Sequence, residues 1–176
     1  MLSKSDKSVG LLYNFTGKGK GKTTGALGTV IRALGWHWKV AVLQFMKSDR
    51  ATGERQFFKE HLPEVLFQEC GLGRSIKVGD HKAFAQDGWK IATDLLQNFD
   101  GDLLVLDEIN IALSHGHLDL DEVLEALKQR RKSLNVIVTG RYSPQAMLDI
   151  SDLVSEINAV KHPYQQGIPA RKGLDY

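Results

Sequence analysis

Short apolar runs alternate along the chain with longer stretches in which apolar residues recur every three or four positions. Runs of the first kind predict six strands, at residues 11–15, 39–45, 64–69, 103–106, 135–139 and 153–160. Stretches of the second kind predict intervening helices, at residues 26–34, 53–62, 83–99, 120–127 and 144–150. Strands that alternate with helices favour right-handed crossovers and a parallel sheet. We therefore predict a doubly wound α/β fold with a mostly parallel six-stranded sheet and helices on both faces.

Several residues mark where the predicted helices begin and end. Gly35 is placed to end the first helix. Asp119 followed by Glu122 resembles a capping box, and Pro144 stands near the first position of the last helix. Gly88 falls inside the predicted helix 83–99, where glycine weakens the helical pattern.

A loop rich in glycine and lysine follows the first strand and precedes the first helix. Such a loop lets backbone N–H groups and a helix N-terminus converge on an anion. Gly21, Lys22 and Thr23 fit the last three positions of the pattern G-x-x-x-x-G-K-[ST], but Thr16 occupies its first glycine position. We interpret the segment as a variant phosphate loop of a P-loop, RecA-like fold, rather than a flexible basic turn. Its residues are Thr16, Gly17, Lys18, Gly19, Lys20, Gly21, Lys22, Thr23 and Thr24.

Acidic and basic residues at other predicted strand ends complete a candidate site. Asp107 and Glu108 directly follow the apolar run 103–106, where a carboxylate can hold a metal ion directly or through water. The alternative is that one of them only caps the next helix. Arg141 follows the fifth strand and is placed to reach the same anion, although on spacing alone a surface arginine is an equally good interpretation. We predict that Lys22 contacts terminal phosphates and that Thr23 ligates Mg²⁺.

Other residues with reactive side chains give weaker indications. His115 and His117 form an H-x-H pair without a third ligand nearby in the sequence, so we interpret them as solvated. Cys70 is interpreted as a small buried filler, and residues 130–132 (Arg-Arg-Lys) as a solvated helix end. No order or spacing indicates a Ser/His/Asp or Cys/His arrangement.

Composition narrows the possible functions. The chain has 176 residues with 42% hydrophobic and 25% charged residues, as in ordinary globular proteins. We expect one nucleotide-binding domain at residues 9–176, preceded by a disordered arm at residues 1–8. The net charge of +2 is too small to indicate a general nucleic-acid or membrane surface. A single cysteine and no apolar leader lead us to expect a cytoplasmic protein.

Several motifs in order resemble the ATP:corrinoid adenosyltransferases of the phosphate-loop type. The loop itself has the family's threonine, and the resemblance continues through Val42–Lys47, Gly53–Arg55, Leu106–Asn110 and the C-terminal segment Ala170–Tyr176. Two parts of the chain depart from the family pattern. Ser48 replaces a common glycine, and Gly71–Lys77 replaces a stretch in which relatives carry aromatic residues that help to cover the corrin ring.

The resemblance implies an alkyl transfer in which Co(I) of a reduced corrinoid attacks the 5′ carbon of ATP and triphosphate leaves. Because the nucleophile belongs to the corrinoid, no catalytic serine or cysteine is needed. Lys22, Glu108 and Arg141 would stabilise the leaving triphosphate, with Mg²⁺ held by Thr23, Asp107 and Glu108. By similarity, Gln44, Lys47 and Glu54 would line the nucleoside and corrinoid side.

The same resemblance implies a homodimer and an electron-donating flavoprotein or another reductant. Two alternatives stay open at this point: a small phosphate-loop kinase or ATPase, and a corrinoid- or nucleotide-binding regulator without turnover. The preferred corrinoid, whether cobalamin, cobinamide or a cobyrinic acid diamide, is not fixed by these motifs.

Overall fold

A single parallel sheet forms the centre of the protein. In the computed structural model, which describes residues 9–45, 52–70 and 81–176, the sheet has six strands in the order β3-β2-β4-β5-β1-β6. The strands are β1 (Leu12–Thr16), β2 (Val40–Gln44), β3 (Leu66–Glu69), β4 (Leu103–Asp107), β5 (Asn135–Thr139) and β6 (Leu153–Glu156). The helices are α1 (Lys22–Gly35), α2 (Gly53–His61), α3 (His81–Asn98), α4 (Ile109–Ser114), α5 (Leu120–Lys128), α6 (Gln145–Ile150) and the 3₁₀-helix η1 (Pro163–Gln166).

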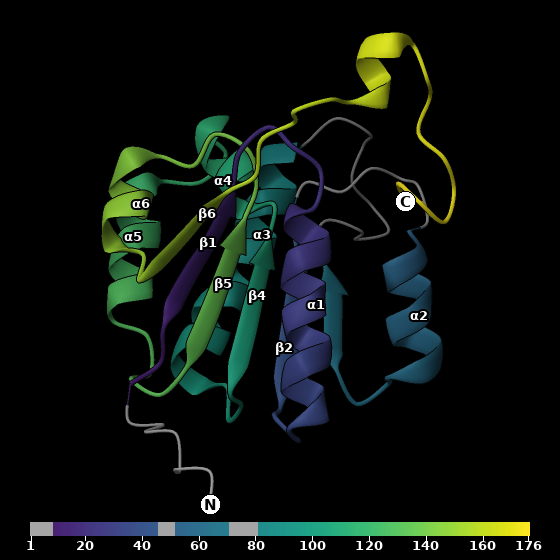
Figure 1. The fold of residues 1–176 in the computed structure, drawn as a ribbon. Coiled ribbons are helices and arrows are strands. Elements are labelled where there is room, and N and C mark those ends of the chain that lie inside the picture. Colours follow the sequence, from purple (N-terminus) through teal and green to yellow (C-terminus); the bar gives the residue numbers. More distant parts are fainter. Residues whose placement is uncertain (1–8, 46–51, 71–80) are drawn as a thin grey trace, which may run out of the picture.

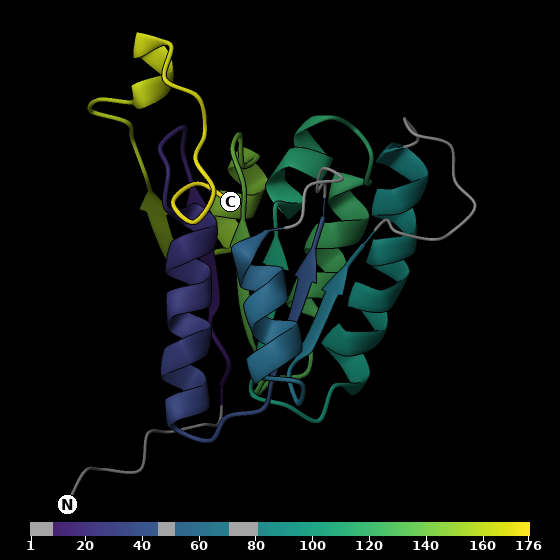
Figure 2. The same ribbon diagram turned by 90° about the vertical axis from the view of Figure 1, so that its right-hand side faces the viewer.

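Helices cover both faces of the sheet, so the predicted α/β fold is confirmed. Helices α1 and α2 pack on one face, and α3, α4, α5 and α6 pack on the other (Figures 1 and 2). Each face has its own apolar cluster. Strands β2 and β4 are buried along their whole length because they lie between the two layers. No helix in the described part of the chain is long and apolar enough to cross a membrane.

The carboxyl ends of the parallel strands meet at one edge of the sheet, at the upper end in Figure 1. The segment after β1, the acidic pair after β4 and the turn after β5 all lie at this edge, since β1, β5 and β4 are neighbours. Ligands of open α/β sheets bind beyond this edge. The topology therefore gathers the predicted site residues from distant parts of the sequence.

Two elements of the structure differ from the prediction. Strand β6 ends at Glu156 rather than at residue 160, because Ile157 turns onto the phosphate loop, where its N–H donates to Thr16 O and its carbonyl accepts from Gly19 N. Helix α4 was not predicted. It begins directly after β4 because Glu108 takes left-handed dihedral angles, with φ 63° and ψ 17°, and turns the chain out of the strand.

Only one of the two hydrogen bonds of the predicted capping box at Asp119 is present. The Asp119 side chain accepts a hydrogen bond from Glu122 N at 2.9 Å, which caps α5. The Glu122 carboxylate does not return this bond in a capping box. It accepts a hydrogen bond from Nε1 of Trp89 at 2.7 Å and so joins α5 to α3.

The interpretation of residues 130–132 as a solvated helix end was wrong for the two arginines. The half-buried guanidinium of Arg130 donates to the carbonyls of Leu127, Leu134 and Gly10. Arg131 donates to Ser133 Oγ and to the carbonyl of Gly101. Both side chains therefore hold loops at the amino edge of the sheet together.

Gly88 has a packing reason for interrupting the α3 pattern. A Cβ atom at this position would lie 2.3 Å from Cys70 Cβ and 3.1 Å from Phe45 Cε1. We expect Gly88→Ala to lower the free energy of unfolding by roughly 1–3 kcal/mol, the usual cost of overpacking a core. Urea denaturation measures this change.

Gly28 provides the control, because a Cβ there meets no atom within 4 Å on helix α1. Gly28→Ala is expected to leave stability unchanged or to raise it by about 0.5–1 kcal/mol, since alanine favours the helix. Equal changes in the free energy of unfolding for the two substitutions would show that the packing of Gly88 against Cys70 and Phe45 does not exclude a larger residue.

Candidate functional site

The segment between β1 and α1 forms a compact loop at the carboxyl edge. Gly17 and Gly21 have positive φ angles of 97° and 122°, a region that glycine enters without strain. A Cβ on Gly17 would also lie 2.4 Å from the carbonyl oxygen of Ile157. The loop thus needs glycine both for its turns and for the close approach of residue 157. It ends at the N-terminus of α1, whose free N–H groups favour an anion.

Lys22 lies at the centre of the candidate site. Its side chain is only 7% exposed, and Nζ donates to the carbonyl of Gly19 at 2.7 Å. Burial lowers the pKa of Lys22 below its ordinary value, while the charge of Glu108 opposes this shift; Arg141 lowers the pKa and Asp107 raises it more weakly. These interactions show that the fold brings the charges of Asp107, Glu108 and Arg141 around one lysine.

Asp107 is fully buried, and three neutral side chains hydrogen-bond to its carboxylate. Oδ1 accepts from the hydroxyls of Thr23 at 2.9 Å and Thr139 at 2.7 Å, and Oδ2 accepts from Nε2 of Gln44 at 3.1 Å. Burial of a carboxylate is costly unless such donors compensate it. Asp107 therefore connects the phosphate loop, through Thr23, to strands β2 and β5.

Glu108 and Arg141 follow the ends of β4 and β5, near this network. Glu108 is half-buried and its N–H donates to Thr139 Oγ1 at 2.9 Å. Arg141 is exposed and follows Gly140, which has a φ of 130°. A Cβ on Gly140 would lie 3.0 Å from Asn110 Cβ and 3.2 Å from Glu108 Oε2. Glycine at this position lets the chain pass close to Glu108.

A buried amide network, which the sequence did not indicate, supports the same edge. Nδ2 of Asn110 donates to Oδ1 of Asn14 at 3.0 Å, and Nδ2 of Asn14 donates to Ser143 Oγ at 2.9 Å. Both asparagines are fully buried. The network joins β1 and α4 to the turn after β5 that carries Arg141. A polar residue inside an otherwise apolar strand, as Asn14 is in β1, was its only sequence signal.

Of the residues expected on the nucleoside and corrinoid side, the structure describes Gln44 and Glu54. Gln44 is fully buried beside Asp107, and Glu54 is half-buried in the first turn of α2. Lys47, Ser48 and Gly71–Lys77 lie outside the described residues. Arg55 forms an ion pair with Glu69 at 2.9 Å, which ties α2 to the end of β3.

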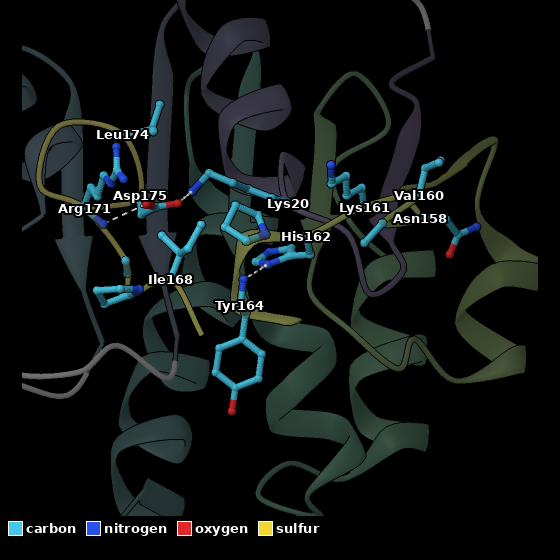
Figure 3. A pocket seen from close by; sticks show the side chains of 14 residues that line it. Lys20, Asn158, Val160, Lys161, His162, Tyr164, Ile168, Arg171, Leu174 and Asp175 are labelled. Carbon is cyan, nitrogen blue, oxygen red and sulfur yellow. Dashed lines mark hydrogen bonds and ion pairs between the residues drawn. The ribbon is translucent and has the colours of Figure 1, made fainter. Parts of the chain in front are cut away.

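The chain after β6, residues 157–176, forms an arm that crosses above the phosphate loop (Figure 1). A cavity of about 740 Å³ lies between this arm and Lys20 of the loop (Figure 3). Asp175 also lines this cavity; it forms an ion pair with Lys20 at 2.6 Å and accepts a second hydrogen bond from Arg171 N. Apolar side chains of the arm, including Val160 and Tyr164, are highly exposed. The arm thus adds one wall beside the loop.

Because the sequence predicts that this loop binds the phosphates of ATP, we expect Asp175→Asn to strengthen that binding by about two- to fivefold, the range of exposed ion pairs. The substitution frees Lys20 from a carboxylate that competes with phosphate for its ammonium. The hydrogen bond from Lys20 also lowers the pKa of Asp175, which keeps its carboxylate charged at neutral pH. Calorimetric titration with ATP measures the effect.

Asp149→Asn is the control, because Asp149 is an exposed aspartate bonded to Gln145 in α6. Weaker ATP binding by Asp175→Asn would show that the carboxylate does not compete with phosphate for Lys20.

The remaining candidates are Cys70, which directly follows β3 at the same edge of the sheet, and a group of histidines. Cys70 is buried, as predicted, and burial raises the pKa of its thiol to about 12. His81 lies beside His117, with ring centroids 6.4 Å apart, and His115 lies 5.6 Å from His117. Nevertheless, within the described ranges no group of three or more His, Cys, Asp or Glu side chains is placed to hold a metal ion.

Comparison with known proteins identifies the family. The model of the family described as "ATP:corrinoid adenosyltransferase BtuR/CobO/CobP" matches residues 8–176. The chain belongs to this family. It is similar to a corrinoid adenosyltransferase of Pseudomonas aeruginosa, with 42% identity over 95% of this chain and 84% of the relative. The corrinoid adenosyltransferase of Escherichia coli K12 shares 37% identity over 95% of this chain and 86% of its own length.

Two further comparisons extend this result. The protein named corrinoid adenosyltransferase CobA of Salmonella typhimurium is 36% identical over 99% of this chain and 90% of its own length. Among solved structures, the flagellar accessory protein FlaH from Methanocaldococcus jannaschii superposes with a TM-score of 0.58. The superposition covers 85% of this chain and 71% of FlaH at 15% sequence identity, so it supports the α/β fold alone.

Proposed function

We propose that this protein transfers the 5′-deoxyadenosyl group of ATP to Co(I) of a reduced corrinoid and releases inorganic triphosphate. Family membership supports this function over the alternative of a small kinase or ATPase. The observation that carries the site assignment is the cluster of Lys22, Asp107, Glu108 and Arg141 at the end of a phosphate loop. Such a cluster suits a reaction in which negative charge develops on a leaving triphosphate.

In the proposed reaction the bond between cobalt and C5′ forms as the bond between C5′ and O5′ breaks. The electron pair of Co(I) enters the new bond, which makes cobalt formally Co(III), and the pair of the broken bond leaves on the triphosphate oxygen. The loop N–H groups and Lys22 would bind the phosphates, and Arg141 would approach from β5. By fixing the triphosphate, these groups hold C5′ in line for attack.

Mg²⁺ is part of the proposal, and the residues present fit it. Thr23 gives its hydroxyl hydrogen to Asp107, so its oxygen lone pairs are available to a cation. Because three donors already bond to Asp107, we infer that Glu108 ligates the ion directly and that Asp107 acts through Thr23. Oε1 of Gln44 is buried without a hydrogen-bond partner among the described residues, as suits an acceptor beside hydrated metal. Bound there, Mg²⁺ would neutralise charge on the triphosphate.

The wider setting is also proposed from the resemblance. We infer that residues 9–176 act as one nucleotide-binding domain, that the protein works in the cytoplasm as a homodimer, and that a flavoprotein or another reductant supplies Co(I). Lys47 and Glu54 stay proposed for the nucleoside and corrinoid side. Analytical ultracentrifugation tests the dimer, and a monomer at micromolar concentration would contradict it.

The decisive experiment is an anaerobic assay with ATP, Mg²⁺ and chemically reduced cob(I)alamin. We expect the Co(I) absorption band to disappear, with light-sensitive adenosylcobalamin and triphosphate as products. Release of orthophosphate without adenosylation would instead favour a kinase or ATPase. Tight ATP or corrinoid binding without any conversion would favour a regulator without turnover.

A further inference from the structure

The hydroxyl of Thr139, the last residue of β5, lies between the two acidic residues of the site. It donates to Asp107 Oδ1 at 2.7 Å and accepts from Glu108 N at 2.9 Å. Thr139 is fully buried, so water does not replace either bond readily. One hydroxyl therefore connects the carboxylate of one acidic residue to the backbone of the other.

The bond from Glu108 N to Thr139 Oγ1 matters because of the unusual backbone conformation of Glu108. Glu108 has a φ of 63°, a left-handed conformation that residues other than glycine rarely adopt. The bond from Glu108 N to Thr139 holds the peptide in this orientation where the chain leaves β4 and enters α4. The direction in which the Glu108 side chain leaves the backbone follows from it.

The first bond extends the connection to the phosphate loop. Oδ1 of Asp107 accepts from Thr139 and also from the hydroxyl of Thr23, at the start of α1. The pairing of β4 with β5 places Thr139 next to Asp107, since Leu106 lies opposite Val138. Thr139 thus stands at the junction of three groups proposed to hold Mg²⁺ and the triphosphate.

We propose that Thr139 is a positioning residue that sets Asp107 and Glu108 in register with Thr23 for binding of the Mg²⁺·ATP complex. The inference rests on the proposed function only in that ATP binds at this loop. Partners of metal ligands typically change metal affinity about 10- to 100-fold when they are removed. The hydroxyl, rather than the bulk of the side chain, carries the effect.

The test compares Thr139→Val, which keeps the shape and removes the hydroxyl, with Thr139→Ser, which keeps the hydroxyl. ATP binding is measured by calorimetry over a range of Mg²⁺ concentrations and with Mg²⁺ absent. We expect Thr139→Val to raise the Mg²⁺ concentration at half-saturation about tenfold or more. The affinity of Thr139→Val for ATP without Mg²⁺ should change less than about twofold. Thr139→Ser should show the same Mg²⁺ dependence as the unmodified protein.

Thr29→Val is the matched control, because the Thr29 hydroxyl bonds to the carbonyl of Gly25 within α1, away from the acidic pair. If Thr139→Val does not fold, Thr139→Ala carries the same comparison. An unchanged Mg²⁺ dependence, or equal losses in the valine and serine variants, would overturn the positioning role. Mg²⁺·ATP binding without adenosyl transfer by the unmodified protein would refute the proposed function and leave this inference standing. Absence of ATP binding by the unmodified protein would overturn it.

Discussion

Lys22→Ala is expected to lower kcat/KM for adenosyl transfer by about 10²- to 10³-fold, the common cost of removing one preorganised group that stabilises developing charge. Lys22 is nearly buried, and Nζ is held at the loop by Gly19 O at 2.7 Å. Its position therefore changes little when triphosphate charge develops. Anaerobic steady-state kinetics measure the loss, with circular dichroism to verify that the fold is retained.

Lys20→Ala provides the control for charge within the same loop. Lys20 is about half exposed, with a side chain 46% accessible, and pairs with Asp175 instead of the acidic pair at β4. We expect a change of only a few-fold from this substitution. Near-normal activity of Lys22→Ala, or equal losses in the two variants, would show that the phosphate-loop assignment is wrong.

The fold was predictable because most of its strands and helices are marked by residues that lie close together in the sequence. Buried strands such as β2 and β4 are short apolar runs, and the amphipathic helices repeat their apolar positions along the sequence. Helix α4 was missed because its start depends on a left-handed turn at Glu108. Its 6 residues are too few to show a helical repeat, and it lacks the proline that precedes the equally short α6. The prediction extended strand β6 too far, because Ile157 leaves the strand and bonds to a loop that is distant in the sequence.

The candidate site was predictable only in part, for the same reason. The phosphate loop and the acidic pair are contiguous motifs, whereas Thr139 gains its role from the register between β4 and β5. The pairing of Lys20 with Asp175 joins residues 155 positions apart. Such contacts depend on strand order and on the path of the arm, which no spacing rule encodes.

Glu108→Gln is expected to raise the Mg²⁺ concentration needed for half-maximal activity by at least about tenfold and to lower kcat about 10²-fold. The substitution keeps the size of the side chain and removes its charge, while the bond from the residue 108 N–H to Thr139 is retained. It also removes the anion that raises the pKa of Lys22 against the effect of burial. The variant thus weakens both the proposed metal ligand and the charge balance around Lys22.

A Mg²⁺ titration of initial rates at saturating ATP separates these effects, because excess Mg²⁺ restores occupancy of the metal site but not the lost charge beside Lys22. We expect activity to rise with added Mg²⁺ and to level off below that of the unmodified protein. Glu125→Gln is the matched control, since Glu125 is an exposed residue of α5 that bonds to Gln129. An unchanged titration for Glu108→Gln would refute direct ligation by Glu108 and would assign the metal to Asp107 and Thr23.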